Sequence, residues 1–194
     1  MPLATAEFSL VLPDNWLPLD VDGEHRIAAE VESLLSRGAA HDPSFNTHRG
    51  RIEKQLRAVI RSMRREPVVM AAVLISVLDD VLPLFASMTA AIVDGGADGY
   101  RGRPGAVARL VELPAAGQAV WQRFTDRSAD PQTGTSLQAA VFQWLVPMPD
   151  RQRRIVLTFV SPDTEPVLLD AFADLFSAVA ESLSFDDGQR RQPR

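Results

Sequence analysis

The pattern of apolar and polar positions changes from strand to helix periodicity within the first third of the chain. Over residues 7–12 every second side chain is large and apolar, which is typical of a half-buried strand. Residues 13–15, Pro-Asp-Asn, favour a turn because proline fixes φ and the two short polar side chains bond their own backbone. Residues 16–21 then predict a return strand, placed at a sheet edge because Pro18 has no N–H to donate.

Two helices are expected next. The first carries apolar residues at helical spacing and ends at Gly38, a C-cap, with the stripe formed by Ile27, Val31, Leu34 and Leu35. Thr47 can cap the second, which runs to about Glu66 because Pro67 disfavours helix in the residue before it. The apolar stripe of this second helix is Ile52, Leu56, Val59, Ile60 and Met63.

The rest of the chain predicts a run of strands followed by one helix. The six expected strands are residues 68–78, 84–93, 107–113, 119–127, 137–146 and 154–160. Between the second and third lies a Gly-rich loop, residues 94–105, with a glycine at every third position from Gly96. A broad apolar face from Val167 to Leu183 predicts the closing helix.

This order of elements predicts the α+β class. Strands joined by short hairpins form antiparallel sheets, so we expect a single antiparallel sheet of about six to eight strands flanked by helices. The length of 194 residues suits one domain, which we assign to residues 1–187. Residues 188–194 are polar and predict a disordered tail.

The amino-acid composition says more about the cellular compartment of the protein than about its activity. The chain has no cysteine, which excludes disulfides, thiolate catalysis and Cys-ligated metals and fits a reducing cytoplasm. Residues 1–7 contain neither the basic nor the apolar region of a secretory signal, and no apolar run reaches the ~20 residues of a membrane span. A net charge of −5 argues against indiscriminate binding to nucleic acid. The preference for arginine over lysine predicts a high-GC bacterial genome.

The layout and several of its segments resemble the PsbP/Mog-type α/β/α sandwich family, in a branch found in high-GC bacteria. The resembling segments are residues 8–16, 144–147, 155–162 and 172–185. Members of that family are mostly non-catalytic adaptors, and the resemblance therefore implies an adaptor. The family's lipoprotein branch does not carry over, because this sequence has no lipobox.

No familiar catalytic constellation is present. The sequence lacks a nucleophile elbow, a phosphate-binding loop, a dinucleotide fingerprint and a metalloprotease motif. The three histidines, at positions 25, 41 and 48, fit exposed helix ends better than a base, and His41, Asp42 and His48 lack the spacing of metal ligands. Asp79 and Asp80 fit a turn. We therefore expect no catalytic residue, no cofactor and no metal.

The second helix is strongly basic, and this leads to the functional hypothesis. Four arginines at positions i, i+4, i+7 and i+8 share one side of it: Arg57, Arg61, Arg64 and Arg65. They form a candidate surface for an acidic protein partner, unless acidic groups of the last helix (Asp170, Asp174 and Glu181) balance them. The sequence predicts a non-enzymatic cytoplasmic interaction or assembly module, with no signal for oligomeric state.

Two other features keep an alternative open. The Gly-rich loop 94–105 could gate a cleft between sheet and helices, which would make the protein a small-molecule binder or minor enzyme. The loop also contains Tyr100, Arg101 and Arg103, which could stack on nucleic acid and pair with its phosphates. This short motif occurs once in an acidic chain, so a hairpin loop is the favoured interpretation. The tryptophans at 16, 121 and 144 are expected in the core, with a shared aromatic cleft as the alternative.

Overall fold

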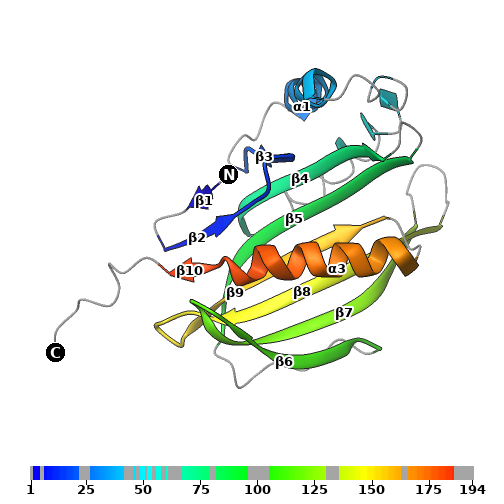
Figure 1. The fold of residues 1–194 in the computed structure, drawn as a ribbon. Helices are drawn as coiled ribbons and strands as arrows, with labels where there is room; N and C mark the ends of the chain where they lie inside the picture. Colours follow the sequence, from blue (N-terminus) through cyan, green and yellow to red (C-terminus); the bar gives the residue numbers. More distant parts are fainter. Residues whose placement is uncertain are drawn as a thin grey trace.

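Two antiparallel sheets and two helices make up the part of the chain that the computed structural model describes (Figure 1). The described residues are 2–4, 7–21, 27–41, 46, 49–50, 52–53, 56–57, 60, 67–78, 82–95, 105–129, 136–162 and 166–185. The predicted tail, residues 188–194, lies outside them.

The large sheet contains seven strands, all antiparallel to their neighbours. Their spatial order is β3 (Trp16–Leu19), β4 (Val68–Leu78), β5 (Leu82–Asp94), β9 (Arg153–Ser161), β8 (Ser136–Pro147), β7 (Gly117–Ala129) and β6 (Val107–Leu113). The six strands expected between residues 68 and 160 all form, each within two residues of its predicted bounds. The prediction of an antiparallel, sheet-dominated fold is therefore confirmed.

A small three-stranded sheet lies beside the large one. It consists of β1 (Pro2–Ala4), β2 (Phe8–Val11) and β10 (Ser184–Phe185), with β2 in the centre. The expectation of a single sheet was wrong, and so was the pairing of the first two predicted strands. After the turn closed by Trp16 N–H to the Pro13 carbonyl (3.1 Å), β3 pairs with β4 instead of β2.

The small sheet forms because both ends of the chain meet there. The strand β10 returns from the last helix and pairs with β2, with Phe185 opposite Phe8. The hydroxyls of Ser9 and Ser184 are hydrogen-bonded at 2.9 Å, and the Val11 N–H donates to Ser182 Oγ at 2.9 Å. These partners are 171 to 175 residues apart in the chain, so local periodicity carries no information about them.

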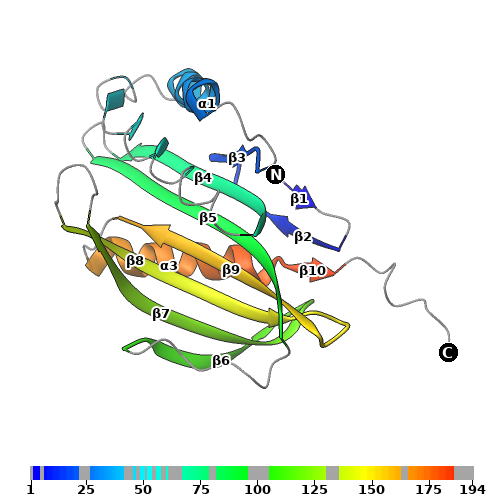
Figure 2. The same ribbon diagram turned by 180° about the vertical axis from the view of Figure 1, so that it is seen from behind.

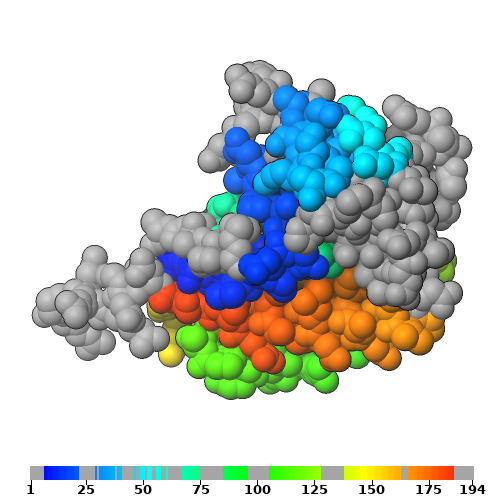
Figure 3. Space-filling model, turned by 45° about the horizontal axis from the view of Figure 1, so that its top comes forward, coloured from blue at the N-terminus to red at the C-terminus, as the bar shows by residue number. Residues whose placement is uncertain are grey.

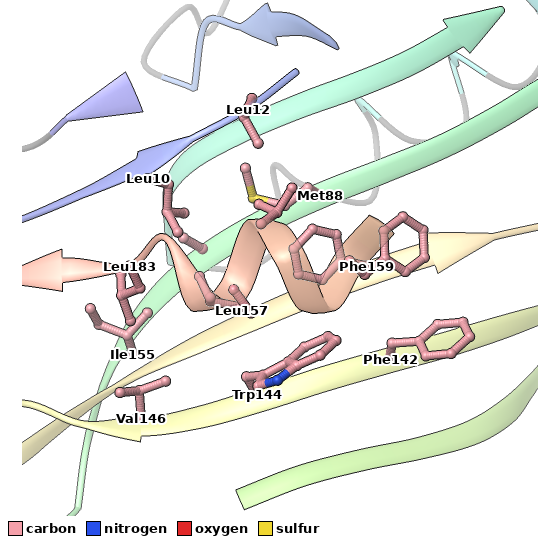
Figure 4. Packing of buried hydrophobic residues seen from close by; sticks show 14 of the residues in the cluster. Leu10, Leu12, Met88, Phe142, Trp144, Val146, Ile155, Leu157, Phe159 and Leu183 are labelled. Carbon is pink, nitrogen blue, oxygen red and sulfur yellow. The ribbon is translucent and has the colours of Figure 1, made fainter. Parts of the chain in front are cut away.

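The helix α3 (Pro166–Glu181) covers one face of the large sheet, as Figure 1 shows. Along β5 the alternate residues Ala86, Met88 and Ala90 are fully buried beneath it. Figure 4 shows this core from nearby, with β8 and β9 residues such as Trp144, Leu157 and Phe159 directed toward the helix. All three tryptophans are buried, as expected.

Aromatic rings form the centre of this core. The Phe176 ring stacks on Phe159 at 4.7 Å and on Phe172 at 5.3 Å, and meets Phe142 edge-on at 5.3 Å. Such ring pairs add about 0.5–1.5 kcal/mol each beyond the area they bury. Since Phe142 and Phe159 come from β8 and β9, Phe176 joins the helix to two strands at once.

The opposite face of the sheet is covered at the β3–β5 end. The helix α1 (Ile27–His41) places Val31, Leu34 and Leu35 on Leu19, Ala71, Val73 and Phe85 of the strands. Ile52, Leu56 and Ile60 join this second cluster, and all three are helical, which agrees with the predicted second helix. Neither described helix lies over β7 and β8 on this side (Figure 2), so the helices do not enclose the sheet as a regular α/β/α sandwich.

The first helix does not end at Gly38 as predicted but continues to His41. A glycine inside a helix costs only about 1 kcal/mol relative to alanine, and two alanines follow it. Ala39 also packs against the second cluster. The favourable packing of the last turn therefore outweighs the C-capping preference of Gly38.

Replacing the central ring should destabilise the whole domain. Phe176→Ala removes a fully buried side chain that contacts four other rings, so we expect the free energy of unfolding to fall by about 3–5 kcal/mol in urea denaturation. The control is Val167→Ala on the same helix, where the side chain is 80% exposed and the change should stay within about 0.5 kcal/mol. Similar losses in both variants would contradict this account.

Candidate functional site

The predicted basic strip lies mostly outside the described residues. Arg61, Arg64 and Arg65 are not among them, so their role as a docking surface stays a prediction. Arg57 is described, and its guanidinium donates to Glu53 Oε1 at 2.6 and 3.1 Å. The acidic residues of α3 (Asp170, Asp174 and Glu181) belong to the helix on the opposite face of the sheet, which contradicts the idea that they balance Arg57.

Most of the candidate catalytic groups lie outside the described residues. His41 is the last residue of α1, whereas His25, His48, Asp79 and Asp80 lie outside the described residues. Within the described ranges, no group of three or more metal-ligating side chains comes together. No helix among them is both long and apolar enough to cross a bilayer.

Basic side chains gather instead along the outer strands, where the sequence analysis did not place a site. Arg109 of β6 lies over the Trp121 ring, 4.6 Å from its centre, and Arg123 of β7 lies 6.0 Å from the centre of Phe142. Strand alternation places Arg127 on the same face. We call Arg109, Arg123 and Arg127 the edge arginines. None of them takes part in the ion pairs that join Arg49 to Glu32, Arg57 to Glu53, and Arg153 to Glu7 and Asp150.

The strand that carries Arg109 is the outermost of the sheet. Among the described strands β6 pairs with β7 alone, and Figures 1 and 3 show it emerging beyond α3. Val107 and Leu110 point to opposite faces and are 62% and 65% exposed. An edge strand has unpaired N–H and C=O groups along its free side, and proteins commonly protect such strands with proline or lysine. β6 contains neither, and its charged side chains are Arg109 and Glu112.

A cavity opens on the face of the sheet away from α3. It measures about 180 Å³ and is lined by Leu110, Gln118, Ala119, Val120, Leu145, Pro147 and Arg154. Leu110, Val120 and Leu145 are direct neighbours across β6, β7 and β8, and they form an apolar floor. Arg154 lies opposite Pro147 and Val93 on the adjoining strands and brings the only charge to the lining.

One nitrogen of the Arg154 guanidinium has no hydrogen-bond partner among the described residues. Its Nε is buried and has no hydrogen-bond acceptor. The first residues of the Gly-rich loop pack beside it: a Cβ on Gly95 would lie 3.7 Å from Arg154 Nη2, and the Gly95 N–H donates to the Gln152 carbonyl at 2.9 Å. Residues 96–104, the predicted gate, lie outside the described residues.

Next to the cavity, a polar ladder crosses three strands. The Gln122 amide donates to Gln143 Oε1 at 2.5 Å, and the Gln143 amide donates to Thr158 Oγ1 at 2.9 Å. Gln122 is only 2% exposed. These bonds satisfy polar groups that would otherwise be costly to bury, so the ladder holds the register of β7, β8 and β9 beside the cavity.

Arg153, the neighbour of Arg154, has the opposite environment. It donates to Glu7 at 3.0 and 3.2 Å and to Asp150 Oδ2 at 2.8 Å. Desolvation acts to raise the pKa of Asp150, but hydrogen bonds from the Arg153 side chain and from two backbone N–H groups outweigh it and lower this pKa. The hydrogen bonds to Asp150 and Glu7 raise the pKa of Arg153.

Comparisons with known proteins give little information about this chain. No family model and no curated protein matches the chain. A crystal structure of a protein from Bacteroides thetaiotaomicron is similar, with a TM-score of 0.43 and 14% identity. The match covers 96% of this chain and 47% of that one, so the chain spans about half the length of this structure. The resemblance to the PsbP/Mog family stays a prediction.

The ion pair of Asp150 should contribute to stability in a pH-dependent way. Because its pKa is lower in the folded protein, the unfolded chain binds the proton first on acidification. The difference in unfolding free energy between the wild type and Asp150→Asn should therefore be constant at neutral pH and shrink below about pH 4. Urea titrations at several pH values measure it.

A direct measurement follows the Asp150 carboxyl by NMR. Its titration midpoint should lie below the ~3.9 of a free aspartate, and Arg153→Gln should move it upward. A midpoint at or above the free value, or a stability difference that grows on acidification, would contradict the assignment.

Proposed function

We propose that the protein is a non-enzymatic cytoplasmic interaction module that binds an acidic, extended segment of a partner protein at the free edge of β6. The observation that supports this most is the exposed strand with Val107 and Leu110 on its two faces and the edge arginines beside it. An added strand would satisfy the backbone groups of β6 and cover both apolar side chains.

Charge favours an acidic partner segment. In an added strand, alternate side chains would lie on the α3 face, next to Arg109 and close to Arg123. Both guanidinium groups are held over aromatic rings, so they lose less conformational entropy on binding than free arginines would. Acidic side chains at alternate positions of the partner would meet them, and such complementarity raises the association rate and fixes the register.

This proposal keeps the predicted class and an acidic partner but moves the contact surface. The predicted strip on the second helix includes Arg57, which is already paired with Glu53, whereas the edge arginines have no such partner in the ion pairs above. The absence of cysteine supports a reducing compartment.

Defined peptides can test the docking of an acidic strand. We expect a labelled ten-residue peptide of alternating valine and glutamate to bind the full chain, and one of alternating valine and lysine to bind at least about tenfold more weakly at low salt. Fluorescence anisotropy gives the affinities. Amide exchange should show new protection along residues 107–113.

Two charge reversals serve as the test and its control. Arg109→Glu should weaken binding of the glutamate peptide and strengthen that of the lysine peptide. Arg37→Glu makes the same charge change on the exposed side of α1 and should leave both affinities within about twofold. Equal binding of the two peptides would refute the proposal. So would a concentration-dependent dimer that protects β6, because a second copy would then be the occupant.

A further inference from the structure

A second binding site is indicated by the cavity on the opposite face of the sheet, and it does not depend on strand docking at β6. We infer that this cavity binds a small monocarboxylate with an apolar body, whose carboxylate pairs with Arg154. Two observations carry the inference: an apolar floor that ends at one arginine, and the absence of an acceptor for the Nε of that arginine.

The unpaired Nε–H of Arg154 points to an anionic group. A buried N–H without an acceptor is costly, and the described residues supply none to Arg154 Nε. The neighbouring positions on the same face, Val93 and Pro147, are apolar, and Glu112, the carboxylate on this face of β6, does not line the cavity. A planar guanidinium suits a carboxylate because the two can form parallel hydrogen bonds.

The size and lining of the cavity limit the rest of the ligand. Sites for drug-sized molecules measure about 300–1,000 Å³, and an apolar cavity of about 150 Å³ accepts benzene. A volume of about 180 Å³ therefore suits an acid with one ring or a short chain. Leu110, Val120 and Leu145 would contact this apolar body, and the Gln118 amide adds one polar group to the lining.

The site lies beside the residue at which the Gly-rich segment begins. Gly95, where an added Cβ would lie 3.7 Å from Arg154 Nη2, has a φ of 109°, which residues other than glycine rarely adopt. The Gly-rich segment therefore begins against the guanidinium. A carboxylate on Arg154 would lie where this segment leaves β5.

Matched ligands separate the contribution of charge from that of shape. Benzoate and benzamide have the same ring, and only benzoate has the carboxylate. We expect the full chain to bind benzoate at least about tenfold more tightly than benzamide in NMR titrations, as a charge-assisted hydrogen bond predicts. Acetate lacks the apolar body and should bind more weakly than benzoate. The Nε–H resonance of Arg154 should shift with benzoate.

Variants locate the site. Arg154→Gln should lower benzoate affinity to that of benzamide without changing the benzamide affinity, and Arg37→Gln on α1 should change neither. Val120→Phe, which fills the cavity, should abolish binding of both aromatic ligands. Retained benzoate binding in Arg154→Gln would overturn the inference.

Ligand comparison in the wild type keeps the test valid if Arg154→Gln does not fold. Equal affinity for benzoate and benzamide, equal affinity for acetate and benzoate, or an unshifted Arg154 Nε–H would each overturn the inference. The two proposals can fail separately. Arg109→Glu should keep benzoate binding, and Arg154→Gln should keep binding of the glutamate peptide.

Discussion

The packing of α3 on the large sheet is the interaction on which the other features depend. Phe176 and Phe172 bring one side of the helix against Phe142 and Phe159, and these rings determine which face of β8 and β9 is the main core. Side chains of a strand alternate between faces, so this contact also directs every second residue to the far side. The cavity and the polar ladder are on that far side as a direct consequence.

Two consecutive arginines of β9 have very different environments because their side chains lie on opposite faces of the sheet. Arg153 lies on the α3 side, where Glu7 and Asp150 satisfy it, and it joins the turn before β9 to the segment that enters the small sheet. Arg154 lies on the other side, among apolar neighbours, with its Nε unpaired. An arginine therefore stabilises the fold at position 153, whereas the arginine at position 154 is the one we propose to bind a ligand.

The two proposed surfaces offer different kinds of interaction to a ligand. The β6 edge offers backbone groups, exposed apolar side chains and solvent-accessible charge, so its contribution should be sensitive to salt. The cavity offers an apolar floor and one partly buried cation, where screening is weaker and an anion is selected more strongly by geometry. Both belong to the end of the sheet away from β3 and α1. They share Leu110, which is exposed on β6 and lines the cavity, whereas the edge arginines lie on the other face.

The sequence by itself determined the elements whose signals are local. Alternation and turn residues placed the six strands between residues 68 and 160 and the closing helix, because burial on one face leaves a period that can be read directly. It could not show that β2 joins β10, or that β6 ends the sheet, since these pairings join distant segments or depend on strand order. The environments of Arg109 and Arg154 likewise depend on register across neighbouring strands. Only the tertiary structure decided which arginine meets a carboxylate, which lies on a ring and which has no partner.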